Sequence, residues 1–412
     1  MIDRAVFTRA AKAGIYALQI DERFGGAGEN DYRYRMVVCE EVARVFAFSF
    51  GLTVSLQDDL VLHYLLDLTN DEQKRRWLPG FASGELIGAL AMTEPGAGSD
   101  LKAIRTTARR DGDHWILNGQ KTFISSGIMA DVVVVAARSN PNGGSRALSL
   151  FVVERDTPGF ERGRQLDKIG LAAQDTAELF FRDAVVPATN LLGEEGRGLQ
   201  YLMSHLPRER LGVTAKAIAN TRAVFDHTVE YCRQRTAFGQ PLTGQQHIRF
   251  ELAEMATEID VAEAYADKSV VAFNAGELTA VDAAKGKWYV SELQKRVIDR
   301  CLQLHGGYGY MTEYPVARAF VDTRVQTIYD HRGLMPRRSG CSHQHHAAGL
   351  NMKRKPAITG DSAFKGRLWV SRGPLRRELL QWPKPLRQAS KDSGSRLNHQ
   401  GEAERLPVSA WC

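Results

Sequence analysis

The residues with the clearest chemistry lie in a glycine-rich stretch, Met92-Thr-Glu-Pro-Gly-Ala-Gly-Ser-Asp100. Because glycine has no Cβ, its backbone N–H groups can come close to an anion or to the edge of a heteroaromatic ring. Thr93 and Ser99, with Ser125 further along the chain, add hydroxyl groups that can hydrogen-bond such a ligand. A tight surface turn has the same composition, so the stretch needs support from other segments.

Further segments supply that support because they follow in a fixed order along the chain. They are Leu117-Asn-Gly-Gln-Lys-Thr-Phe-Ile-Ser-Ser-Gly127, Arg235-Thr-Ala-Phe-Gly239 with Gln246, and Gln303-Leu-His-Gly-Gly-Tyr-Gly-Tyr310. Together with the glycine-rich stretch, this set resembles the flavin-binding signature of the acyl-CoA dehydrogenase family. The resemblance covers about three quarters of the chain and ends at Tyr329. It implies an α+β fold with an N-terminal helical domain, a middle antiparallel β domain and a C-terminal helix bundle.

The resemblance also implies FAD as cofactor, bound near a subunit interface of a homo-oligomer, a tetramer or a dimer. The helix bundle is expected to contribute to a flavin on a neighbouring subunit, and the loop around Gly306 to contact its adenosine diphosphate. Carried over residue by residue, the expected FAD contacts are Met92, Thr93, Gly98, Ser99, Phe123, Ser125, Arg235, Phe238, Gln246, Gln303, Gly306 and Gly307.

The implied reaction is the α,β-dehydrogenation of an acyl-CoA thioester, in which a carboxylate removes the α-proton and the β-hydrogen leaves as a hydride. No protein side chain accepts a hydride, so a redox cofactor is required. Many members of the family place the carboxylate as Glu directly after the Ile-Tyr that matches Ile328-Tyr329, where this chain has Asp330. Long-chain and isovaleryl-type members instead carry Glu at the start of the first bundle helix. Leu206-Pro-Arg-Glu-Arg-Leu211 is similar to that second pattern, so Glu209 is the expected base.

The expected substrate contacts are Ser99, Arg210, Tyr329 and Asp330. Arg210 would be an electrostatic partner of the base, and the backbone N–H of Asp330 would hydrogen-bond the thioester carbonyl. Glu209 has a second interpretation, a favourable acid in the first turn of a helix. In this family the electrons usually pass to an electron-transfer flavoprotein. Two alternatives stay open: a non-catalytic member that associates with paralogues, and an acyl-CoA oxidase.

The elements that position these residues follow from apolar spacing. Residues 1–88 form the expected N-terminal helical domain, shortened at its start relative to the family, with apolar three- and four-residue spacing in Glu40 to Leu52 and Asp71 to Phe81. Asn70 is the expected N-cap of the second stretch, and Pro79-Gly80 its stop.

A change of period predicts a middle β domain over residues 89–196. The expected strands are His114 to Leu117, Asp131 to Arg138, Ala147 to Glu154 and Ala177 to Phe181, with a tight hairpin turn at Asn118-Gly119. Residues 197–330 are the expected helix bundle, with long helices over Gln245 to Asn274 and Leu278 to Leu304 and an interruption at Phe238-Gly239.

The last part of the chain, residues 331–412, holds 16 Lys/Arg against five Asp/Glu and has no sustained period. We expect this atypical basic tail to be disordered or loosely packed. The body of the chain lacks that basic excess, so no nucleic-acid partner is expected. A cluster of His343, His345 and His346 near Cys341 has no second ligand pair at zinc spacing, and no metal site is expected.

The overall composition is that of a soluble globular protein, with 43% hydrophobic and 25% charged residues. No apolar run reaches the roughly 20 residues that a membrane helix needs. The N-terminus shows no secretory signal, so a cytoplasmic location is expected. The five cysteines lack CxxC spacing and are expected to be reduced thiols.

Overall fold

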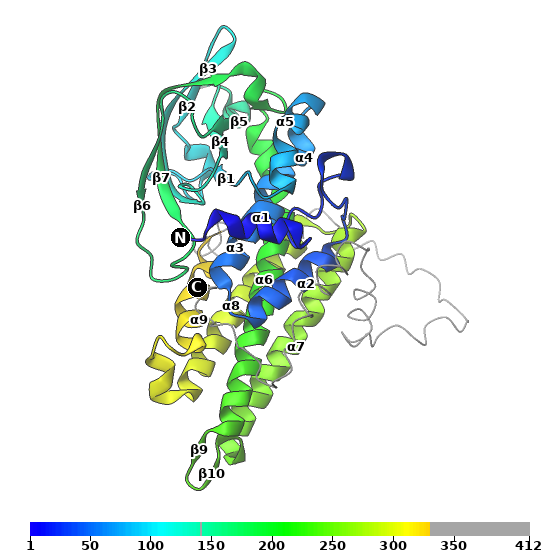
Figure 1. Ribbon diagram of the computed structural model, residues 1–412, viewed down its shortest axis with the longest axis vertical. Coiled ribbons are helices and arrows are strands. Elements are labelled where there is room, and N and C mark those ends of the chain that lie inside the picture. The colour runs from blue at the N-terminus through cyan, green and yellow to red at the C-terminus, as the bar shows by residue number, and fades with distance from the viewer. Residues whose placement is uncertain (141, 330–412) are drawn as a thin grey trace, which may run out of the picture. The chain divides into compact units, whose positions relative to one another are not determined.

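The structure is a computed structural model that describes residues 1–140 and 142–329 (Figure 1). The expected substrate contact Asp330, the histidine cluster around His345 and the expected basic tail lie outside the described residues.

The first part of the chain is helical. Its helices are α1 (Arg4–Lys12), α2 (Tyr32–Arg44), α3 (Phe48–Ser55), α4 (Leu62–Leu68) and α5 (Asp71–Ala82). A π-helical turn, η2 (Leu56–Val61), joins α3 to α4. The predicted N-cap is confirmed, since Asn70 and Gln73 form a reciprocal capping box at the start of α5.

Two local predictions in this part are wrong. Glu40 to Leu52 does not form one helix: α2 ends at Arg44, and Phe46 follows in the left-handed region at φ 55°. A residue with positive φ cannot continue a right-handed helix, so the chain turns there before α3. Pro79-Gly80 does not stop α5, which continues to Ala82.

The middle of the chain forms one sheet, in which most neighbours are antiparallel. Its strands are β1 (Gly88–Ala91), β2 (Thr107–Asp111), β3 (His114–Ser125), β4 (Val132–Arg138), β5 (Leu148–Glu154), β6 (Phe160–Gln165), β7 (Thr176–Pro187) and β8 (Leu191–Leu192). Their order is β6-β7-β3-β2-β4-β5-β8, and β1 pairs with β4. The β1–β4 pairing is parallel, as is the single bridge between β2 and β4. The expected antiparallel sheet therefore also contains parallel pairs at β4.

The expected hairpin turn at Asn118-Gly119 is wrong, because β3 passes straight through it. A register shift against β7 lies between Leu117 and Gly119, which marks a bulge. A Cβ at Gly119 would lie 2.5 Å from Thr106 Oγ1, so the close approach of the loop to the strand requires glycine there. The actual turn between β2 and β3 contains Gly112, at φ 58°.

Long helices return after the sheet: α6 (Gly198–Gln234), α7 (Gln246–Asn274), α8 (Ala280–Leu304) and α9 (Pro315–Thr323). The predicted spans of α7 and α8 agree with these bounds to within two residues. The predicted interruption at Phe238-Gly239 is also confirmed, as the turn between the short strands β9 (Thr236–Ala237) and β10 (Gln240–Pro241).

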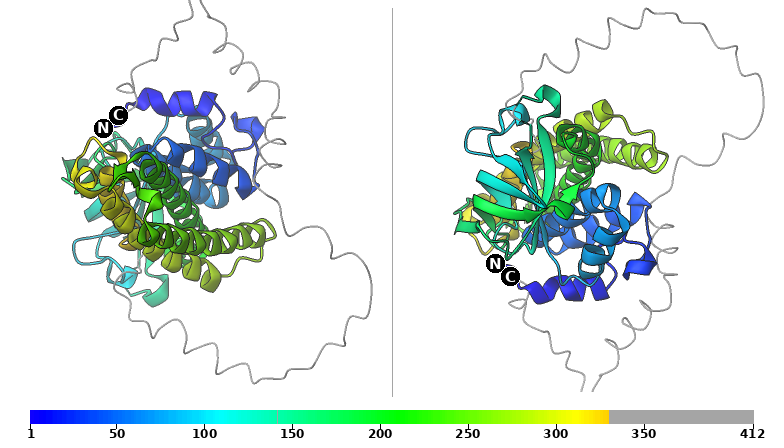
Figure 2. Two further views of the ribbon diagram at one scale, coloured as in Figure 1. Left: turned by 90° about the horizontal axis from the view of Figure 1, so that it is seen from below. Right: turned by 90° about the horizontal axis from the view of Figure 1, so that it is seen from above.

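The packing of the described residues joins the three parts through shared cores. Alternate residues of β4 point to opposite faces of the sheet: Val132 and Val134 pack with the N-terminal helices, and Val133 and Val135 pack on the other side. Helix α2 belongs to the bundle core, where Tyr32 packs with residues of α6, α7 and α8. Figure 2 shows the N-terminal helices, in blue, beside the green helices of the bundle.

Candidate active site

The glycine-rich loop after β1 is anchored by a buried carboxylate. Glu94 accepts hydrogen bonds from the backbone N–H groups of Arg105 (2.6 Å) and Thr106 (2.9 Å) and from the Thr106 hydroxyl (2.6 Å). It also forms an ion pair with Lys121 on β3 at 2.8 Å, and Lys121 donates to the Met92 carbonyl. Both ends of the loop are therefore fixed to the sheet.

The electrostatics of this pair favour an ionised carboxylate. Burial works to raise the pKa of Glu94, but the Lys121 ammonium and the hydrogen bonds lower it below its ordinary value. Burial lowers the pKa of Lys121 to about 8 in spite of the attraction to Glu94. At neutral pH the pair is charged, so Glu94 serves as a structural anchor of the loop.

The expected contacts on β3 lie beside this loop. The Thr122 N–H donates to the Thr93 carbonyl at 3.0 Å, which brings Phe123 and Ser125 next to Met92 and Thr93. Phe123 adopts the left-handed region at φ 58° and its ring is 68% exposed. A bulky residue in that region is strained, and such strain clusters at functional sites. The first residues of the glycine-rich loop thus lie beside β3, which carries Phe123 and Ser125. Gly98 and Ser99 follow further along the same loop.

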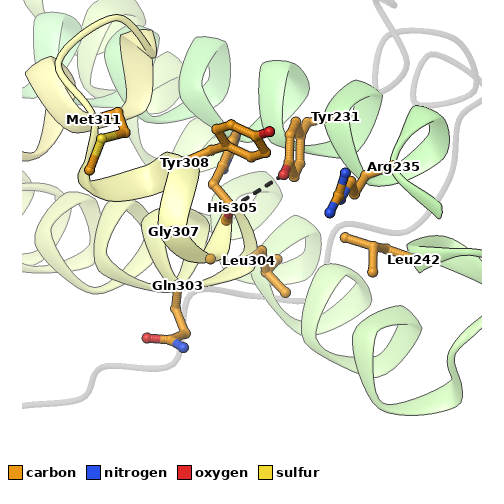
Figure 3. A pocket seen from close by; sticks show the side chains of 10 residues that line it. Tyr231, Arg235, Leu242, Gln303, Leu304, His305, Gly307, Tyr308 and Met311 are labelled. Atoms are coloured by element: carbon orange, nitrogen blue, oxygen red, sulfur yellow. Dashed lines mark hydrogen bonds between the residues drawn. The ribbon is translucent and has the colours of Figure 1, made fainter. Parts of the chain in front are cut away.

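A second group of expected contacts meets in a groove of about 500 Å³ on the bundle (Figure 3). Arg235 comes from the end of α6, Gln303 from α8, and Gly306 and Gly307 from the short 3₁₀ helix η7 (Gly306–Tyr310). The Arg235 guanidinium lies 5.8 Å from the centre of the Tyr308 ring. A guanidinium group and glycine backbone N–H groups in the same groove are suited to bind a diphosphate.

Several groove residues were not predicted from the sequence, among them Tyr231 and His305. The Tyr231 ring stacks on the His305 ring at 4.1 Å, and its hydroxyl donates to the His305 carbonyl at 3.3 Å. Tyr231 precedes Arg235 by one helical turn, and His305 lies inside the Gln303 motif, so both were recoverable from spacing. The other missed lining residues are Leu242, Leu304, Tyr308 and Met311.

Two expected contacts lie outside this groove. Phe238 sits at the tip of the β9–β10 turn with its side chain 96% exposed, and Gln246 is the exposed first residue of α7. None of the residues lining the groove comes from the sheet. The described chain therefore offers two separate half-sites, one on the sheet and one on the bundle.

The two half-sites fit the two ends of a flavin dinucleotide. A Cβ added at Gly98, or at Gly307 in the groove, would meet no atom within 4 Å, so backbone is open to a ligand at both places. The exposed Phe123 ring offers an apolar face to a heteroaromatic ring, and Arg235 offers a cation to a diphosphate.

The open space at Gly98 gives a first prediction. We expect Gly98→Ala to raise the Kd for FAD about tenfold, because the methyl group occupies the space that backbone N–H groups need for close approach. Titration of the flavin-free protein with FAD, followed by flavin fluorescence, measures this. The matched control is Gly96→Ala on the same loop, where an added Cβ also meets nothing. Equal affinity in Gly98→Ala and the wild type would contradict the placement.

The expected base is buried inside α6. Glu209 is the twelfth residue of that helix and is 2% exposed, so the alternative that it is a favourable acid in the first turn of a helix is wrong. Its Oε1 accepts a hydrogen bond from the Tyr64 hydroxyl of α4 at 2.8 Å. The neighbouring Arg210 is half-buried. A carboxylate that is shielded from water and held by a partner has the environment that a general base requires.

The end of the described chain packs against the same helix. Lys287 of α8 donates to the Tyr329 carbonyl at 2.7 Å, and the Lys216 ammonium lies 5.6 Å from the centre of the Tyr329 ring. Lys216 follows Glu209 by two turns of α6, about 10 Å along the axis. The Tyr329 ring thus packs beside α6, near a residue two turns along the helix from Glu209.

Other features of the described residues concern packing rather than chemistry. Cys39, Cys232 and Cys301 are free and buried, and burial raises the pKa of Cys232 to about 11. Within the described ranges, no group of three or more His, Cys, Asp or Glu side chains is arranged to hold a metal ion. No described helix is both long and apolar enough to cross a membrane.

Comparison with family models gives three consecutive matches. Residues 1–85 match the N-terminal domain of acyl-CoA dehydrogenases, residues 89–184 the middle domain, and residues 196–332 the C-terminal domain.

Individual proteins agree with these matches. The long-chain specific acyl-CoA dehydrogenase of Sus scrofa is 45% identical over 330 residues, which are 80% of this chain and 76% of that protein. The crystal structure of an acyl-CoA dehydrogenase from Geobacillus kaustophilus matches with a TM-score of 0.78 and 47% identity, covering 81% of this chain and 87% of that one. A Mycobacterium smegmatis glutaryl-CoA dehydrogenase in complex with FADH2 matches with a TM-score of 0.75 and 29% identity, covering 80% and 83%.

Proposed function

The chain belongs to the acyl-CoA dehydrogenase family of flavin-dependent oxidoreductases, and we propose that it catalyses the α,β-dehydrogenation of a long- or branched-chain acyl-CoA thioester. The observation that carries the proposal is the burial of Glu209, which is 2% exposed within α6 and hydrogen-bonded to Tyr64. The segment around it, Leu206 to Leu211, is similar to the pattern of long-chain and isovaleryl-type members of the family.

In this proposal Glu209 removes the proton from the α-carbon of the acyl group, and the electron pair of that C–H bond forms the new double bond. Exclusion of water keeps the carboxylate basic and protects the enolate that develops. Arg210 and Ser99 position the substrate in this proposal, and the backbone N–H of Asp330 hydrogen-bonds the thioester carbonyl. The preceding residue, Tyr329, accepts a hydrogen bond from Lys287 through its carbonyl. FAD, when bound, supplies the acceptor for the β-hydrogen and its electron pair.

The flavin would be held by the two half-sites already described. On the sheet, the loop anchored by Glu94 presents Thr93, Gly98 and Ser99, and β3 presents Phe123 and Ser125. On the bundle, Arg235, Gln303, Gly306 and Gly307 would contact the adenosine diphosphate. Because the groove contains no residue of the sheet, we propose that each flavin contacts two copies of the chain, with Phe238 and Gln246 reaching the neighbour's flavin in a homotetramer or dimer.

We propose an electron-transfer flavoprotein as the electron acceptor. We also propose a cytoplasmic location. An acyl-CoA oxidase would run the same half-reaction with oxygen as acceptor, and release of hydrogen peroxide during aerobic turnover distinguishes it. A non-catalytic family member would bind partners without reducing its flavin.

The visible spectrum of the FAD-saturated protein tests the proposal. We expect the flavin band to bleach on anaerobic addition of a long-chain acyl-CoA, because two electrons leave the substrate. A protein that binds FAD but does not bleach with straight- or branched-chain substrates would contradict the proposed reaction and support the non-catalytic alternative.

A further inference from the structure

The proposed base is held by a residue from outside the bundle. Tyr64 of α4 is fully buried, and its hydroxyl donates to Glu209 Oε1 at 2.8 Å. These residues are separated by 145 positions, so the bond joins the N-terminal helices to the helix that carries the base. A hydrogen bond to a carboxylate favours its ionised form, which is the form that removes a proton.

A second contact beside the first one fixes the geometry. The Tyr64 ring stacks on the His205 ring at 4.4 Å with an interplanar angle of 21°. His205 Nε2 lies 3.1 Å from the Asp67 carboxylate, and its Nδ1 lies 2.8 Å from the Tyr201 carbonyl oxygen. Both ring nitrogens of His205 therefore have partners, which sets the ring plane against which Tyr64 packs.

These contacts have a regular pattern. Tyr64 and Asp67 are three residues apart on α4, and His205 and Glu209 are four residues apart on α6. Residues at these spacings lie on one face of a helix, so each helix presents two side chains to the other. We name this set of four residues the base clamp. It holds the Tyr64 hydroxyl in one direction, towards Glu209.

The charges around the base clamp also act on the pKa of His205. Burial works to lower the pKa of His205, but hydrogen bonds to Asp67 and to the Tyr201 carbonyl, together with the Asp67 and Glu209 charges, raise it above its ordinary value. Around the clamp, Arg208 and His63 also act on the Asp67 carboxylate and help to lower its pKa. His205 lies one turn from Glu209 on the same helix, so the two side chains share a face of α6.

We propose that Tyr64 is a positioning residue that orients the carboxylate of Glu209 and keeps it ionised for α-proton removal, with His205 and Asp67 holding Tyr64 in place. This inference rests on the proposed function of Glu209. The N-terminal helices would thereby take part in proton removal.

The test compares Tyr64→Phe with the wild type in the FAD-saturated protein. Exchange of the α-proton of an acyl-CoA with D2O, followed by mass spectrometry without an electron acceptor, reports proton removal directly. We expect the exchange rate of Tyr64→Phe at neutral pH to fall about tenfold, because the Glu209 carboxylate loses the group that orients it towards the α-carbon. The acidic limb of its pH profile moves to higher pH by about one unit, because the ionised form loses a donor. The half-saturating concentration of acyl-CoA should change less than about twofold.

A matched control separates positioning from general damage. Tyr265→Phe on α7 also removes one hydroxyl, which donates to the Asp282 carbonyl at 3.0 Å, and it should leave the pH profile unchanged. Thermal unfolding of Tyr64→Phe, Glu209→Gln and the double variant gives a readout independent of turnover. Shifts in the melting temperature should be non-additive if the two groups interact.

The outcomes distinguish the inference from the function on which it rests. If Glu209→Gln retains exchange, the proposed function of Glu209 is wrong. If Glu209→Gln is inactive while Tyr64→Phe has the wild-type rate and pH profile, or if the melting shifts add, the base stands and the role of Tyr64 is overturned.

Discussion

Replacement of Glu209 by glutamine should reduce α-proton exchange about a thousandfold or more, because the amide cannot accept the proton and a positioned general base contributes roughly 10²–10⁴-fold. Glutamine has nearly the same shape, and its carbonyl can still accept the Tyr64 hydrogen bond that the structure shows at 2.8 Å. The fold and FAD binding should therefore be retained. The loss should be the same in anaerobic bleaching and in deuterium exchange.

The control for this variant is Glu254→Gln on α7, which removes an exposed carboxylate paired with Arg300 at 2.9 Å. It should leave both assays unchanged. A Glu209→Gln protein that still exchanges its substrate, together with loss of exchange in Asp330→Asn, would move the base to position 330.

Replacement of Lys121 by methionine should lower the free energy of unfolding by about 3 kcal/mol, since Glu94 and the Met92 carbonyl both lose a buried hydrogen-bond donor that even a neutral amine would supply. Lys121 is fully buried and lies 2.8 Å from Glu94. The same change releases the Met92 carbonyl, so the glycine-rich loop should bind FAD more weakly. Urea unfolding, with and without FAD, measures both effects.

Two further variants test whether the loss of stability comes from the buried pair of Lys121 and Glu94. Lys102→Met removes an exposed lysine of the adjacent short helix and should change stability by less than about 0.5 kcal/mol. The double variant Lys121→Met/Glu94→Gln should be more stable than Lys121→Met, because the neutral amide no longer leaves an uncompensated charge. A double variant as unstable as the sum of the two single changes would contradict the ion-pair explanation.

The depressed pKa of Lys121 also predicts how the free energy of unfolding changes with pH. The folded pKa of Lys121 is about 8, below the ordinary value of 10.5, so the unfolded chain binds more protons between these values. Stability should therefore rise with pH in that window, and Lys121→Met should lose this part of the slope. Unfolding in urea at a series of pH values measures it.

The sequence allowed good predictions wherever structure depends on neighbouring residues. The capping box of Asn70 and Gln73 and the limits of α7 and α8 follow from spacing along one helix. Arg235, Gln303, Gly306 and Gly307, which the resemblance gave as FAD contacts, line one groove, and their contact with FAD stays a prediction. Asn118-Gly119 misled because an Asn-Gly pair suits a tight turn in isolation, whereas here Gly119 is needed for the approach of Thr106.

Partners that are distant in the sequence could not be predicted. The resemblance identified the glycine-rich loop that contains Glu94. The role of Glu94 as an anchor of that loop depends on its ion pair with Lys121 of β3, which the sequence does not show. The sequence around Tyr64 predicts only that its ring packs in the core, because the partner of its hydroxyl, Glu209, lies on α6. Periodicity shows which face of a helix is buried, and it does not show which polar atom lies opposite.

The separation of 145 residues between Tyr64 and Glu209 has a consequence for synthesis of the protein. At about 5–20 residues per second, a ribosome would add Glu209 roughly 7–30 s after Tyr64. Through that interval the bundle-facing side of the N-terminal helices, including Tyr32 of α2, lacks the partner surface that covers it in the folded chain. A nascent chain stalled before α6 should therefore bind chaperones, and a released one should lose them as that helix docks.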